Sequence, residues 1–110
     1  AAFVPRPAFH SEEAIAVIHA ASGAAVLAHP GAHLPEHVIE RLKDAGLDGV
    51  EVWHPVHGPN AVKRWHQIAQ RLGLIESGGS DFHGLHRGAG LGDMPVPERT
   101  VERLRDAAAR

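Results

Sequence analysis

Apolar residues recur every three or four positions in four stretches of the chain, as they do along the buried face of an α-helix. Ser11 begins the first stretch where an N-cap residue is preferred, and two glutamates follow it in the first turn. Gly23, Gly46 and Gly73 follow the first three stretches and are typical helix stops. The pattern predicts helices over residues 11–22, 35–45, 59–72 and about 98–109.

Short apolar runs lie between these helices, at Ala24–Ala28, at Gly49–Trp53 and from Leu74 onward. Runs of this length bounded by glycine and proline are typical of strands that are buried on both faces. Strand, loop and helix therefore alternate along the chain. This order predicts an α/β fold of three consecutive β/α units, with parallel strands joined by right-handed crossovers.

The composition narrows the class of protein. With 110 residues the chain is expected to form one domain, and 11 basic against 13 acidic residues provide no broad cationic surface for nucleic acid. It has no run of about 18 apolar residues and no recognisable leader, so we expect no membrane association and a cytoplasmic location. Cysteine is absent and there are ten histidines, so any metal would be held by histidine, aspartate or glutamate.

Histidines and an aspartate stand where the predicted strands end. His29 follows the first strand, His54 and His57 follow the second, and Asp81 and His83 follow the third. The carboxyl ends of parallel strands share one edge of a sheet, so these side chains should converge there. Imidazoles and carboxylates suit zinc, manganese or iron(II). We therefore predict that His29, Asp81 and His83 are metal ligands; the simpler alternative for Asp81 and His83 is a turn-capping aspartate beside a surface histidine.

Two further residues have roles that the pattern leaves open. His54 and His57 lie three apart in one loop, so one can face the site while the other faces solvent. We favour His57, which lies further from the strand, as the catalytic group that contacts substrate or transfers a proton. Glu51 interrupts an apolar strand, where a carboxylate is costly without a hydrogen-bond partner. It is either a structural carboxylate or a support for the metal ligands.

Three segments, Ala28–Gly31, Gly49–Val52 and above all Gly78–Gly84, resemble the carboxyl-terminal half of the phosphoesterases of the polymerase and histidinol phosphatase (PHP) superfamily. The branch that looks closest contains nucleoside 3′,5′-bisphosphate phosphatases and 5′-to-3′ exoribonucleases that act on short RNA. The resemblance implies part of a distorted (β/α)7 barrel with two or three manganese, zinc or iron ions at its carboxyl rim. It also implies that metal-activated water attacks a phosphomonoester or a terminal phosphodiester.

The resemblance assigns residues by position. His29 matches the histidine of the family's Ala-His-Pro motif, and Asp81 and His83 match its last two metal ligands. His57 falls where family members vary. The family's amino-terminal His-x-His motif, bridging glutamate and next histidines have no counterpart in these 110 residues.

Residues 1–110 are therefore expected to form a single partial PHP domain, its carboxyl-terminal half. The expected activity is hydrolysis of phosphate esters in nucleotides, short RNA or a phosphorylated small molecule, once a missing amino-terminal half or a second copy completes the site. Histidinol phosphate is an alternative substrate. An alternative of another class is a half-domain that binds metal or dimerises without catalysis.

Overall fold

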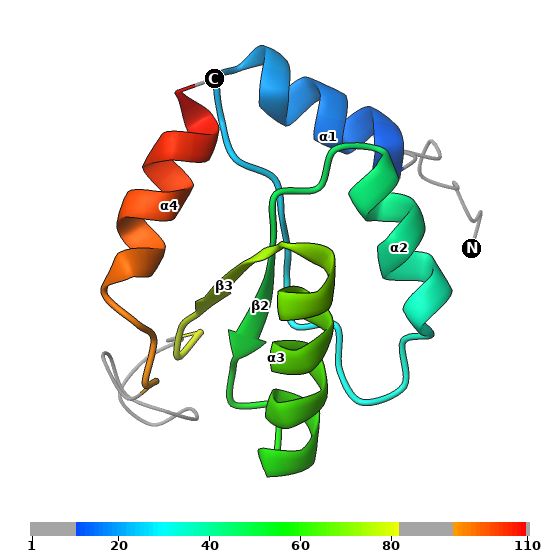
Figure 1. The fold of residues 1–110 in the computed structure, drawn as a ribbon, viewed down its shortest axis with the longest axis vertical. Helices are drawn as coiled ribbons and strands as arrows, with labels where there is room; N and C mark the ends of the chain where they lie inside the picture. The colour runs from blue at the N-terminus through cyan, green and yellow to red at the C-terminus, as the bar shows by residue number, and fades with distance from the viewer. Residues whose placement is uncertain (1–10, 82–93, 110) are drawn as a thin grey trace, which may run out of the picture.

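The computed structural model describes residues 11–81 and 94–109, which contain four helices and three strands. Figure 1 shows them in the order helix, then three strand–helix pairs. The elements are α1 (Ser11–Ala20), β1 (Val26–Leu27), α2 (Glu36–Asp44), β2 (Gly49–Trp53), α3 (Pro59–Leu72), β3 (Ile75–Gly78) and α4 (Arg99–Ala108). The predicted α/β organisation is confirmed, although most of the loop expected between β3 and α4 lies outside the described residues.

The three strands form one parallel sheet in the order β1-β2-β3. Val26 of β1 pairs with Gly49 of β2, and Gly49 pairs in turn with Ile75 of β3. Because all three strands run the same way, their carboxyl ends lie at one edge of the sheet. The predicted convergence of the three strand exits is therefore present in the fold.

The core lies where α3 packs on the central strand. Val50 and Val52 of β2 are fully buried, as are Trp65 and Ala69 of α3. Ile39 of α2 is fully buried too, and Figure 1 shows α2 beside α3. The apolar spacing that predicts α3 is thus the spacing of its buried face. None of the described helices is long and apolar enough to cross a membrane.

The first strand is shorter and more open than its sequence predicts. The apolar run suggests a fully buried strand over residues 24–28, but only Val26 and Leu27 pair with β2, and both are half-buried. Val26 borders an open groove of about 360 Å³ whose other wall is α4, including Val101 and Leu104. An apolar run shows that a strand is suited to burial, but it does not show which residues cover the strand.

A β-bulge interrupts the pairing of β2 with β3 just before the sheet edge. Glu51 pairs with Ser77, but the next pair joins Trp53 to Gly78, so β2 carries one extra residue. A Cβ atom at Gly78 would lie 2.5 Å from the Trp53 carbonyl oxygen, so only glycine fits without a shift of the backbone. Bulges of this kind redirect the residues that follow them. The residue that follows β2 directly is His54.

Candidate metal site

The edge formed by the strand exits brings together His29, His54 and Asp81, one from the segment after each strand. One ligand atom from each of the three lies within 4.8 Å of the other two. Two ligands of one zinc ion lie at most about 4.4 Å apart, since each is about 2.0–2.2 Å from the metal. His29 and Asp81 are exposed, so small side-chain rotations would bring the three donors to one ion.

The His54 ring is held by two hydrogen bonds that define its protonation. The Val56 N–H donates to His54 Nδ1 at 3.0 Å, so a neutral ring carries its proton on Nε2. His54 Nε2 is 3.0 Å from Asp81 Oδ2 and donates to it. The ring of His29 lies against that of His54, with centroids 4.6 Å apart. His54 thus orients the Asp81 carboxylate, and would have to release its Nε2 proton before binding a metal through that atom.

Asp81 takes an unusual backbone conformation at the end of β3. Its φ is 52°, in the left-handed region that few residues other than glycine enter, although aspartate and asparagine do so more readily. The preceding Ser80 is buried, whereas Asp81 is exposed at the edge. Strained backbone of this kind is common where a side chain is held for function.

Glu51 contacts the site through the backbone of a predicted ligand. Its Oε1 accepts a hydrogen bond of 2.9 Å from the backbone N–H of His29. The carboxylate on β2 therefore ties down the loop that leaves β1. This contact agrees with either alternative for Glu51, because a structural hydrogen bond here also supports His29.

His57 lies apart from the cluster and makes different contacts. It is 7% exposed, its Nδ1 donates to the Val52 carbonyl at 2.8 Å, and its Nε2 accepts from the Gly31 N–H at 2.9 Å. Both nitrogens are thus engaged with backbone groups. A direct role for His57 in substrate contact or proton transfer stays a prediction, and in this conformation neither nitrogen is available for it.

The structure places the two histidines of the β2 exit differently from the expectation that one faces the site and the other faces solvent, because both are buried. His54 faces His29 and Asp81, while His57 points into the scaffold. One signal in the sequence favours His54, because the residue directly after a parallel strand stays at the rim whereas one three further on can turn back. His83, the remaining predicted ligand, lies outside the described residues.

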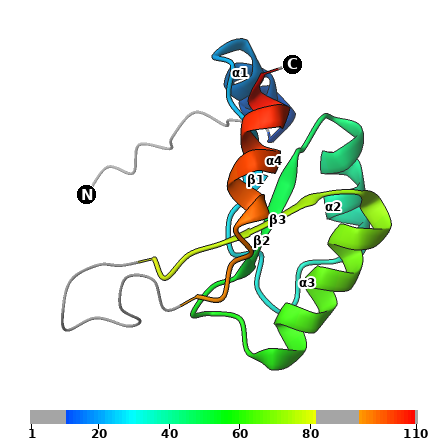
Figure 2. The same ribbon diagram turned by 60° about the vertical axis from the view of Figure 1, so that its left-hand side comes forward.

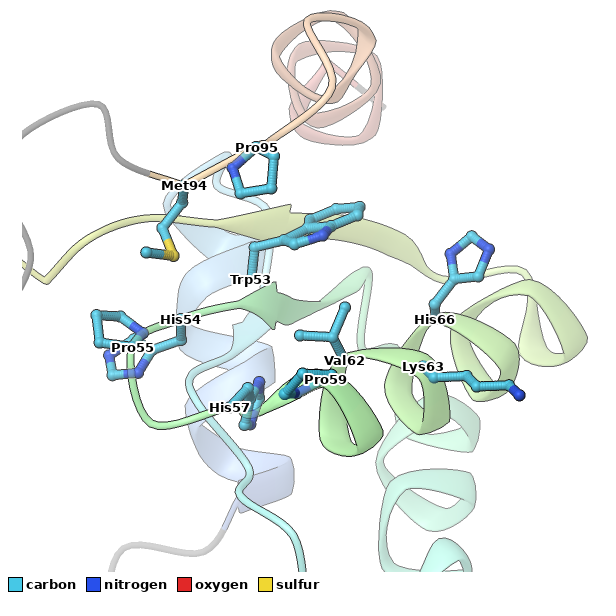
Figure 3. A pocket seen from close by; sticks show the side chains of 10 residues that line it. All are labelled: Trp53, His54, Pro55, His57, Pro59, Val62, Lys63, His66, Met94 and Pro95. Carbon is cyan, nitrogen blue, oxygen red and sulfur yellow. The ribbon is translucent and has the colours of Figure 1, made fainter.

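A groove of about 740 Å³ runs from the β2 exit along α3. Figure 3 shows Met94 and Pro95 on one side, Pro59 and Val62 on the other, and Trp53 between them. The remaining lining residues are His54, Pro55, His57, Lys63 and His66. Trp53 is half-buried, and His54 belongs both to the groove and to the cluster.

The donors in the cluster fit a divalent transition metal. His29 and Asp81 offer an imidazole and a carboxylate, and the His54 imidazole would be a third donor once its Nε2 proton is released. Zinc, manganese and iron(II) accept such ligands, whereas magnesium and calcium prefer more oxygen. Glu51 and the His54–Asp81 hydrogen bond provide the outer contacts that orient metal ligands in proteins. The described residues therefore include a group that could hold a metal ion at this edge.

Comparison with known sequences finds relatives among hydrolases of phosphate esters, although no protein-family profile matches the chain. The chain is 38% identical over 74 residues to a phosphoribosyl 1,2-cyclic phosphate 1,2-diphosphodiesterase of Eggerthella lenta, and 40% identical over 77 residues to a 3′,5′-nucleoside bisphosphate phosphatase of Chromobacterium violaceum. It is 36% identical over 86 residues to the 5′-3′ exoribonuclease Rnm of Salmonella typhimurium. The matches cover 67%, 66% and 74% of this chain but only 28%, 27% and 29% of those relatives.

Solved structures agree with the sequence matches. A Bifidobacterium adolescentis protein assigned as a metal-dependent phosphoesterase superposes with a TM-score of 0.85 and 33% identity, covering 96% of this chain and 39% of that one. An amidohydrolase of Chromobacterium violaceum, solved with bound sulfate and no metal, gives a TM-score of 0.74 and 29% identity over 92% of this chain and 39% of that one. The chain is therefore related to the PHP-type metal-dependent phosphoesterases, and its partial coverage of them fits a carboxyl-terminal portion of that domain.

Proposed function

We propose that this chain forms part of a metal-dependent phosphoesterase that hydrolyses phosphomonoesters or terminal phosphodiesters of nucleotides or short RNA. The observation that carries the proposal is the meeting of His29, His54 and Asp81 at the exits of three parallel strands. A manganese, zinc or iron ion there would lower the pKa of water and draw negative charge from a phosphoryl oxygen. The names of the relatives support phosphate esters as the substrate class.

The residues of this chain have distinct roles in the proposal. His29, Asp81 and His83 hold metal, and the complete domain contains two or three ions. His54 donates to Asp81 and keeps one carboxylate oxygen directed into the site. Glu51 fixes the backbone of His29 from the neighbouring strand. None of these roles requires the chain to position the whole substrate.

The groove beside His54 supports a substrate with a ring system attached to its phosphate. Trp53, Met94 and three prolines line it with apolar and aromatic surface, and Lys63 stands at its border. A phosphate held near His54 would leave the rest of a nucleotide beside this groove. A nucleoside phosphate, whose base and sugar offer more ring surface than the single imidazole of histidinol phosphate, therefore fits the surroundings of the cluster better.

A further portion of protein is proposed to complete the site. The chain spans between 27 and 29% of the lengths of its curated relatives, and the three ligands assigned to it are few for a site with several ions. The open groove between β1 and α4 provides an apolar surface, including Val101, on which such a portion could pack. An amino-terminal half, or less simply a second copy of this chain, is the proposed partner, in the cytoplasm.

The experiment combines this chain with the amino-terminal portion of the Chromobacterium violaceum phosphatase, as a fusion or a mixture. With Mn²⁺ we expect hydrolysis of a nucleoside 3′,5′-bisphosphate only when both portions are present. Asp81→Asn should lower kcat/KM at least about 100-fold, since loss of a metal ligand exceeds the effect of losing an outer contact. Asp106→Asn, which removes the same charge from the exposed face of α4, is the matched control.

The outcomes separate the alternatives. A folded pair with no activity that depends on metal and on Asp81 would contradict the proposed function and favour a half-domain that binds metal without catalysis. Turnover by this chain alone, lost in Asp81→Ala, would contradict the need for a partner. Faster release of phosphate from histidinol phosphate than from the nucleotide would favour the alternative substrate.

A further inference from the structure

The loop that follows β1, residues 29–34, carries His29 and is the His29 loop. Side chains from β2, its exit and α3 hold this loop by its backbone. Glu51 accepts from the His29 N–H at 2.9 Å, and Arg64 Nη2 donates to the Leu34 carbonyl at 2.7 Å. His57 and Trp65 contact it between these two points. The position of His29 therefore depends on side chains outside its own strand.

Two side chains form hydrogen bonds with the backbone of Gly31, one with its N–H and one with its carbonyl. Its N–H donates to His57 Nε2 at 2.9 Å, and its carbonyl accepts from Trp65 Nε1 at 2.7 Å. Its φ is +80°, in the left-handed region, and no atom would lie within 4 Å of a Cβ built there. Glycine is therefore favoured here because of its backbone conformation and not because a side chain would lack space. Two side chains fix the backbone at the residue where the loop turns, two positions after His29.

The His57 ring has one protonation state that satisfies its surroundings. The Val52 carbonyl accepts from Nδ1, 2.8 Å away, which leaves the lone pair of Nε2 for the Gly31 N–H. The ring therefore links the end of β2 to the His29 loop and is itself buried. Trp65, a fully buried residue of α3, provides the second link through its side-chain N–H.

We propose that His57 and Trp65 are positioning residues, which set the metal-binding geometry of His29 through the backbone of Gly31. Neither is a metal ligand in the proposal, and both act through hydrogen bonds to the backbone of the loop. The inference rests on the proposed role of His29 as a ligand, and it gives His57 an indirect role in place of the proton transfer expected from the sequence. Loss of either link should weaken metal binding more than it weakens the fold, because outer contacts of metal ligands tune affinity.

Matched substitutions at His57 separate its two hydrogen bonds. Asn places its amide about where Nδ1 lies and can keep the bond to Val52, whereas Gln reaches the place of Nε2 and can keep the bond to Gly31. Zinc affinity, measured by calorimetry on the chain, should fall about tenfold in His57→Asn, at the low end of the effect of outer contacts. His57→Gln should recover most of the affinity. His37→Asn, at an exposed position on α2, should leave it unchanged.

Trp65→Phe removes the N–H and keeps most of the ring, so it tests the second link. We expect zinc affinity to fall by a factor of about three to ten, again as for an outer contact. Amide exchange measured by NMR gives a readout that needs no metal. The Gly31 amide should exchange at least about tenfold faster in His57→Asn than in His57→Gln or His37→Asn, because its acceptor is lost.

The two readouts keep failure of the inference distinct from failure of the proposed function. A parent chain that binds no zinc, or binds it no better than His29→Asn does, would contradict the proposed metal site. The Gly31 exchange rates of the His57 variants would still test the hydrogen bond between His57 and Gly31. Parental zinc affinity in both His57→Asn and Trp65→Phe would overturn the positioning role. So would ring ¹⁵N shifts that place the His57 proton on Nε2, or unchanged exchange at Gly31.

Discussion

The packing of α3 on β2 and the groove between α4 and β1 contrast within one small fold. In the first region Val52 and Trp65 are fully buried, whereas in the second Val26 is half-buried and Val101 is 53% exposed. Figure 2 shows α3 and α4 on different sides of the strands. The described residues thus build a closed core under α3 but leave apolar surface beside α4 open.

The largest effect of a substitution is expected where α3 packs on β2, which is the closed region of the fold. Trp65→Ala should lower the free energy of unfolding by about 3–5 kcal/mol, because it empties a large site in the core and removes the hydrogen bond to Gly31. Urea denaturation followed by circular dichroism measures the change. A loss below about 1 kcal/mol would mean that the α3–β2 interface is not the main core.

In the groove between α4 and β1, the open region, a substitution should change association and leave stability almost unchanged. Val101→Ser removes exposed apolar surface, so the free energy of unfolding should change by less than about 0.5 kcal/mol. Association should weaken instead, either with an added amino-terminal portion or between copies of the chain. Sedimentation velocity over a range of concentrations tests this. A substantial loss of stability in a monomeric chain would show that Val101 is already covered and would remove the contrast.

The smallest effect should come from ion pairs on the outer surface of the closed region. Arg71 of α3 reaches Glu36 at 2.9 Å and Glu40 at 3.4 Å on α2, with all three side chains about half-exposed. Water screens such pairs, so Arg71→Ala should cost only a few tenths of a kcal/mol, and less in high salt. Thermal melts at two salt concentrations would reveal it. A cost near that of Trp65→Ala would contradict an apolar origin of the closed region's stability.

The elements of this fold are largely predictable from sequence because local patterns determine them. The apolar spacing of α3 matches its buried residues Trp65 and Ile68, and the glycine after it ends the helix in the left-handed conformation. The parallel sheet follows from the alternation of strands and helices. The open state of β1 is not predictable in this way, since burial of Val26 depends on surface that another element has to provide.

The candidate site is predictable only in part. His29 and Asp81 follow from their places at strand ends, and the structure brings them together. That His54, and not His57, faces this cluster cannot be predicted from the sequence. It depends on which backbone groups lie within hydrogen-bond reach of each ring in the folded chain. The Gly31 N–H and the Val52 carbonyl draw His57 inward, while the Val56 N–H holds His54 toward Asp81. These partners are distant or non-periodic in sequence and appear only once the strands are paired.

If the three strand exits form one metal site, zinc should bind there, and anomalous diffraction from crystals of the chain grown with zinc would locate it. We expect a strong zinc peak in contact with His29 and Asp81, with the His54 ring alongside. Zinc bound only at exposed histidines such as His33 or His37, with no peak between His29 and Asp81, would contradict it.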